Sequence, residues 1–147
     1  MESLVSTFRT THYFLMVALL VFLIFTIGKF AFKKSDGSPF GAMEDKTTLL
    51  VLILSHIQLL IGLFLLFVGP MSNNFANMGE VMKDSYLRMM TVEHPLTMII
   101  GVALITIGRV KMKKKSEAEA KFKTIIIFYS IALVLFLSRI PWSHLNG

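Results

Sequence analysis

The sequence contains no cysteine among its 147 residues. Disulfides, iron–sulfur clusters, thiolate zinc sites and covalently attached c-type haem are therefore excluded, because each of them needs a cysteine sulfur. Redox or metal chemistry in this chain would depend on a noncovalent cofactor held by histidine or methionine. The chain has ten methionines and four histidines, namely His12, His56, His94 and His144.

Charged residues are also scarce, at 16% of the chain, whereas 54% of the residues are hydrophobic and fall in four blocks. A helix that crosses a bilayer needs about 20 predominantly apolar residues. The blocks therefore predict an all-α integral membrane protein in which a single four-helix bundle domain covers residues 1–147. The expected spans are residues 10–32, 47–69, 89–111 and 122–141.

The ends of the first two blocks carry recognisable signals. No small-residue cleavage site follows the first block, which runs directly into Lys33 and Lys34. We therefore expect a retained membrane span there and not a signal peptide. The second block stops at Gly69 and Pro70, because proline cannot continue the hydrogen-bond ladder of a helix.

The 15 lysines and arginines are distributed unevenly over the connections between the blocks. Eleven of them lie around the first and third connections. Because cytoplasmic loops carry an excess of Lys and Arg, this bias predicts a multi-pass inner-membrane protein whose two termini and second connection lie outside. The four cations on the outer side are Arg9, Lys83, Arg88 and Arg139.

The net charge of +6 has a topological explanation, so we do not expect nucleic acid as a partner. The basic residues sit in short loops beside hydrophobic spans, where the positive-inside bias accounts for them. The lysine run over residues 111–115 is also compatible with contact to anionic lipids.

Three histidines can be ordered by depth from the rise of about 1.5 Å per helical residue. His12 and His94 lie near the outer ends of two helices that run in the same direction, so we expect them within one turn of each other in height. His56 is near mid-membrane and should be about 10 Å or more deeper. A polar side chain at that depth is expected to face the bundle interior.

These positions favour a haem b site, because two inward-facing histidines on different helices can ligate one haem in a four-helix bundle. His94 and His12 are the expected iron ligands, and His56 is a further candidate. Gly101, two turns after His94, would leave room for a flat macrocycle. The expected partners of the haem propionates are Arg9, Arg88 and Arg139.

Simpler interpretations of the same residues remain open. Histidines at a membrane interface are tolerated without a function, and Gly101 also suits close helix packing. His56 would otherwise serve a quinone or proton path, or only hydrogen-bond within the bundle. Glu93 is expected to turn to solvent or to Arg88 and not to the neighbouring His94. Ser55 and His56 point about 100° apart on a helix and cannot form a nucleophile–base pair.

Three segments carry a resemblance to a known family. They are SHIQLLIGL at 55–63, EHPLTMIIG at 93–101 with its continuation to Gly108, and IPW at 140–142. They resemble a family of small bacterial four-helix membrane proteins labelled cytochrome b-like, and the likeness covers nearly the whole chain. The resemblance implies haem binding and matches His12, His56 and His94, without identifying the ligand pair. Pro95 departs from the family pattern. The fourth span has no histidine, so the two-haem arrangement of larger cytochromes b is not supported.

The predicted function is that of a b-type haem membrane protein that passes electrons between a quinol-like donor and an acceptor on the outer side. Such a chain would be a membrane oxidoreductase or an electron-transfer subunit, with the bilayer, a quinone and other membrane redox subunits as partners, in a homo- or hetero-oligomer. Two alternatives stay open. One is a copper-handling protein with His12, His94 and loop methionines as soft ligands. The other is a cofactor-free accessory subunit of a larger complex.

Overall fold

The computed structural model describes residues 1–144, and for His144 it describes the backbone only. The described residues form helices and connections, with no strand among them. Four segments are long and apolar enough to cross a membrane, which confirms the predicted all-α chain with four candidate spans. The long helices are α1 (Glu2–Ser35), α2 (Ala42–Val68), α5 (His94–Lys113) and α6 (Ala118–Ser138).

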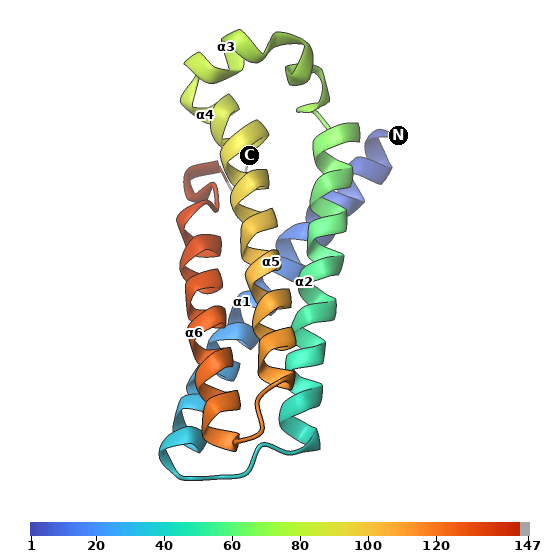
Figure 1. Ribbon diagram of the computed structural model, residues 1–147. Coiled ribbons are helices and arrows are strands. Elements are labelled where there is room, and N and C mark those ends of the chain that lie inside the picture. Colours follow the sequence, from blue (N-terminus) through green and yellow to red (C-terminus); the bar gives the residue numbers. More distant parts are fainter. Residues whose placement is uncertain (145–147) are drawn as a thin grey trace.

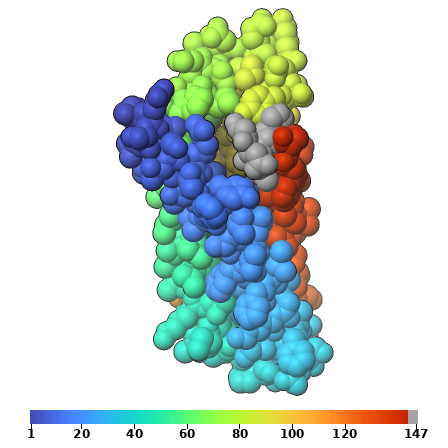
Figure 2. All heavy atoms as spheres, turned by 180° about the vertical axis from the view of Figure 1, so that it is seen from behind, coloured from blue at the N-terminus to red at the C-terminus, as the bar shows by residue number. Residues whose placement is uncertain are grey.

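The four long helices form a bundle in which α1 and α5 each contact both α2 and α6. Helices α1 and α5 are therefore diagonal to each other. Helix α1 crosses the bundle obliquely, with its first half over α2 and its second half beside α6 (Figures 1 and 2). Helix α1 begins and α6 ends at the same end of the bundle (Figure 1).

The connection between α2 and α5 caps this end of the bundle with short helices (Figure 1). Its last turn is a π-helix, in which the backbone N–H of His94 donates to the carbonyl of Met89, five residues back. Pro95 follows this turn at the start of α5 and has no N–H to donate to a preceding carbonyl. The elements are η1 (Ser72–Asn77), α3 (Met78–Lys83), α4 (Ser85–Arg88) and η2 (Met89–Glu93).

Helix α1 begins at Glu2, about two turns before the expected start of the first span. Residues 2–11 contain no glycine or proline that would stop a helix, and two threonine hydroxyls donate to carbonyls four residues back. The predicted end of the second span is confirmed, because α2 stops at Val68 just before Gly69 and Pro70. A helix can thus extend beyond its apolar block wherever no residue breaks it.

Burial divides the bundle into two parts. We call residues 19–34, 42–55, 101–113 and 118–132 the lysine half, and residues 6–18, 56–68, 92–100 and 133–140 the histidine half. In the lysine half all four helices contribute fully buried side chains. In the histidine half, residues 6–18, 56–68 and 92–100 include no buried residue. Most of the packed core therefore lies in the lysine half, and the histidine half contributes Phe136 of α6 and Ile140 just after it.

The lysine half is held together by aromatic and polar contacts between helices. The rings of Phe30 and Phe122 have centroids 5.3 Å apart, and Phe40 packs against both. Arg109 on α5, whose side chain is 11% exposed, pairs with Asp45 on α2 at 3.2 Å. The buried hydroxyl of Tyr129 on α6 donates to a carbonyl of α2. These contacts connect every long helix to at least one other.

Candidate functional site

The histidine half brings two histidines from diagonal helices together. The ring centroids of His12 on α1 and His94 on α5 are 6.3 Å apart, and the ring planes are inclined at 81°. This proximity confirms the prediction that the two residues lie at the same height. It also shows that both rings point into the bundle from opposite corners, because α1 and α5 are not neighbours.

His94 is held in one orientation by the backbone of another helix. Its Nδ1 lies 2.7 Å from the carbonyl oxygen of Arg139, just after the end of α6. A carbonyl can only accept, so Nδ1 carries the proton and donates. In a neutral ring the other nitrogen, Nε2, is then left with its lone pair. A backbone carbonyl on the second ring nitrogen is the arrangement that orients histidine ligands of metals.

His12 lies beside Gln58 and Gly62 of α2. The Gln58 side chain donates from Nε2 to the backbone carbonyl of His12 at 2.8 Å. A Cβ placed on Gly62 would come within 3.1 Å of Cε1 of His12, so this glycine leaves the space that the ring occupies. Within residues 1–144, two buried atoms here have no hydrogen-bond partner, His12 Nδ1 and Gln58 Oε1. Buried polar atoms are normally paired, so these two mark a place for a bound group or water.

Sequence reasoning missed the role of Gln58 and Gly62 beside His12. The two residues are four positions apart on α2 and therefore share one face of the helix. The four-residue spacing was the only sequence signal that linked the two residues. It could indicate the site only after the structure showed that this face of α2 contacts α1.

The region over Gly101 is occupied by an aromatic side chain. A Cβ on Gly101 would overlap the ring of Phe136, which packs from α6 directly against the glycine. The structure thus gives Gly101 the packing role, and the room that was expected there for a macrocycle is taken by Phe136. No residue of 6–18 on α1 or of 56–68 on α2 is buried.

The prediction that His56 faces the bundle interior is wrong. Its side chain is exposed, and its Nδ1 donates to the carbonyl of Leu52 in the same helix at 2.8 Å. The neighbouring Ser55 is fully buried, and successive side chains on a helix point about 100° apart. His56 is deeper than the His12 ring, as expected, because six residues of α2 separate it from Gly62, about 9 Å of helix.

The three arginines lie at the same end of the bundle but differ in their partners. Arg88 donates from Nε to Glu93 at 2.9 Å, so of the two orientations expected for Glu93, toward solvent or toward Arg88, the structure shows the second. Arg139 approaches the other oxygen of Glu93 at 3.9 Å. Arg9 is exposed, and no ion pair of Arg9 is found within residues 1–144. Glu93 therefore contacts two of the three arginines, and it directly precedes His94 in the sequence.

The site offers two imidazole ligands from the protein. In the described part of the chain no group of three or more His, Asp or Glu side chains is placed to hold a metal ion. A metal bound at the pair would therefore need further ligands, such as water or the donor atoms of a cofactor. Metal–nitrogen bonds are about 2 Å long, so with ring centroids 6.3 Å apart both imidazoles could reach one metal ion.

Comparison of the chain with protein-family models, with curated proteins and with solved structures finds no match.

Proposed function

We propose that this chain is a membrane protein that binds one b-type haem in the histidine half, where His94 and His12 would hold its iron. The observation that supports it is the 6.3 Å separation of two inward-facing imidazoles, one of them oriented by a backbone carbonyl. A further feature agrees with it. Two buried polar atoms beside the pair, His12 Nδ1 and Gln58 Oε1, have no hydrogen-bond partner within residues 1–144.

The residues of the site have distinct parts in this proposal. His94 presents Nε2, because its Nδ1 proton is engaged by the Arg139 carbonyl. Gln58 fixes the backbone of α1 at His12, and Gly62 keeps the space for the His12 ring. Haem would supply a one-electron redox couple whose potential depends on its axial ligands and on the surrounding hydrogen bonds.

We propose that the protein passes electrons between a quinol-like donor in the membrane and an acceptor at the histidine end. The site lies near one end of the candidate spans, since His12 is eleven residues from the N-terminus and His94 begins α5. Arg9 is exposed at that end, where it can meet an anionic group or partner. Arg88 and Arg139 hold Glu93 beside the same site.

Substitution of single histidines tests the ligand assignment. In protein purified from a haem-sufficient host, His12→Ala or His94→Ala should remove the b-type absorption band or convert it to that of five-coordinate haem. Added imidazole should restore the six-coordinate spectrum, which distinguishes a lost ligand from a lost fold. The matched control is His56→Ala, which should keep the band because His56 is exposed. Equal loss in all three variants, or bound copper without haem, would contradict the proposal.

We also propose that the histidine end, with both termini, faces the outside of an inner membrane. The lysine end carries eleven of the 15 cations, as expected for the cytoplasmic side. Because the chain has no cysteine, Ser3→Cys and Ser116→Cys each provide a single labelling site. A membrane-impermeant maleimide should label the Ser3 variant in intact cells and the Ser116 variant only after lysis. The reverse pattern would overturn the orientation.

A further inference from the structure

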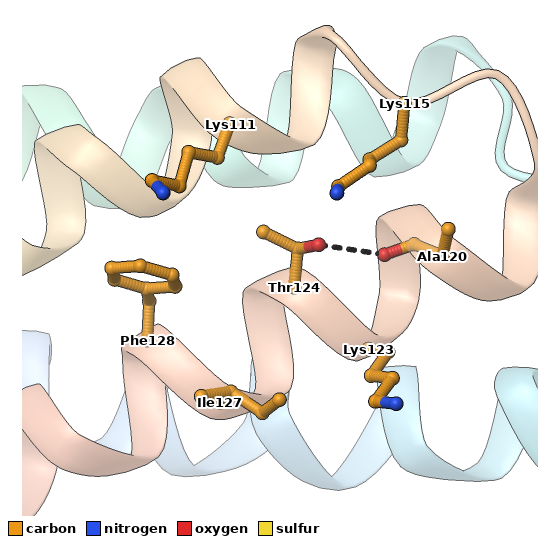
Figure 3. A pocket seen from close by; sticks show the side chains of 7 residues that line it. All are labelled: Lys111, Lys115, Ala120, Lys123, Thr124, Ile127 and Phe128. Carbon is orange, nitrogen blue, oxygen red and sulfur yellow. Dashed lines mark hydrogen bonds between the residues drawn. The ribbon is translucent and has the colours of Figure 1, made fainter.

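A groove between α5 and α6 lies at the end of the bundle opposite the histidines. It has a volume of about 400 Å³ and is lined by Lys111, Lys115, Ala120, Lys123, Thr124, Ile127 and Phe128. Figure 3 shows Lys111 and Lys115 reaching from the α5 side toward α6, with Thr124 and Phe128 opposite them. The haem proposal uses none of these residues.

The groove is positively charged, with Lys115 and Lys123 toward the start of α6 and Lys111 beside Phe128. Its described lining contains three lysines and no acidic side chain. All three lysines are exposed and lie where α5 ends and α6 begins, near the boundary of the candidate spans. Helix α6 also directs the positive end of its dipole toward this place, because Ala120 is its third residue. The polar end of the groove therefore attracts an anion.

The other end of the groove is apolar and points toward the middle of the bundle. Ile127 and Phe128 lie one to two turns further along α6 than Lys123. Phe128 is fixed in the groove because α5 has a glycine, Gly108, directly against its Cβ. The exposed Ile131 and Val134 continue the apolar surface along α6, and Ile107 continues it along α5. A long hydrocarbon chain can lie on this strip.

Lys111 spans the two ends of the groove. Its ammonium lies 6.0 Å from the centroid of the Phe128 ring, a cation–π distance. The hydroxyl of Thr124 is engaged with the Ala120 carbonyl at 2.8 Å, so the lysine ammoniums are the donors available to a ligand (Figure 3). A ligand with an anionic head and an apolar body matches this order of groups.

We propose that the groove binds one anionic glycerophospholipid, with its phosphate between Lys111, Lys115 and Lys123 and an acyl chain along Ile127 and Phe128. Basic pockets between membrane helices are suited to such headgroups. A free phosphate ion would bind the lysines but would leave the apolar strip without a contact. A zwitterionic lipid would meet the strip but bring a positive group to the lysines.

Titration of delipidated full-length protein in detergent with phosphatidylglycerol, followed by native mass spectrometry, tests the site. The groove variant carries Lys111→Gln, Lys115→Gln and Lys123→Gln. The control carries Lys46→Gln, Lys113→Gln and Lys114→Gln, which remove the same charge from the same end outside the groove lining. Affinity should fall about tenfold or more in the groove variant and less than twofold in the control. Equal losses would contradict a specific groove.

Competition separates a lipid from a free anion. Inorganic phosphate and glycerol phosphate should displace phosphatidylglycerol only weakly, and phosphatidylcholine should bind about tenfold more weakly than phosphatidylglycerol. Displacement by glycerol phosphate at the concentration of the lipid would overturn the lipid assignment. To test the apolar strip, Ile127→Ser should lower the affinity for phosphatidylglycerol about threefold. Ile24→Ser, at an exposed position of α1, should not change it. Equal effects of these two variants would also contradict the proposal.

Discussion

Phe30, Phe122 and Tyr129 of the lysine half are at most 1% exposed, whereas residues 6–18, 56–68 and 92–100 of the histidine half include no buried residue. The lysine half pairs its buried charge, since Glu44 meets Lys33 at 3.2 Å. Among the described residues, the histidine half instead leaves His12 Nδ1 and Gln58 Oε1 without hydrogen-bond partners. The contrast indicates that the lysine half supplies most of the buried packing of the bundle, and it agrees with the haem site that we propose in the histidine half.

The strongest test of this contrast removes a ring from each half. Phe122→Ala should lower the free energy of unfolding by about 3–5 kcal/mol, because a fully buried aromatic ring leaves a cavity. Phe14→Ala in the histidine half should have little effect, since Phe14 is 64% exposed. Thermal or dodecyl sulfate unfolding in detergent measures both. Similar losses for the two variants would break the distinction between the halves.

Glycine substitutions probe the helix contact at the boundary of the halves. Gly101→Ala should destabilise the protein by about 1–3 kcal/mol, because the new methyl group overlaps the Phe136 ring. Gly28→Ala meets open space and should stabilise by up to about 1 kcal/mol through helix propensity. The same unfolding assay should therefore give opposite signs. A neutral Gly101→Ala would show that α5 and α6 are not closely packed there.

Removing one buried hydroxyl tests the polar contacts of the lysine half. Tyr129→Phe should cost about 0.5–1.5 kcal/mol, since the carbonyl of Thr48 loses its donor in a dry interior. Tyr13→Phe is the matched control, because Tyr13 is exposed on α1. An effect of the control as large as that of Tyr129→Phe would contradict the assignment.

The smallest effect on stability is expected from Gln58→Leu in the histidine half. Loss of the bond to the His12 carbonyl is offset by removal of the unpartnered Oε1, so the change should stay within about 1 kcal/mol. The variant should nevertheless lower haem retention measured by absorbance per chain. A large loss of stability with unchanged haem content would show that Gln58 serves the fold and not the site.

Topology alone predicted the central pair of the candidate site. Helices one and three run in the same direction, and His12 and His94 lie near equivalent ends, so the rise per residue places them at one height. The pairing of Glu93 with Arg88 and the stop of α2 before Pro70 followed from local chemistry. These predictions depended on distance along a helix, which the sequence specifies.

The rotation of each helix about its axis could not be predicted. His56 and Ser55 are adjacent polar residues, and only packing decides that Ser55 is buried and His56 exposed. Gly101 gave no sign that Phe136 would fill the space above it from α6. The contact of Gly62 with the His12 ring could not be predicted either, because it exists only where α1 crosses α2 obliquely (Figure 1). Contacts between helices that are distant in sequence set these orientations.

The reduced-minus-oxidised absorption spectrum of the purified wild-type protein, together with its haem content per chain, tests the central claim most directly. If the histidine half is a ligand site for haem, protein from a haem-sufficient host should show a six-coordinate b-type spectrum with one haem per chain. Colourless protein from the same host would contradict the account.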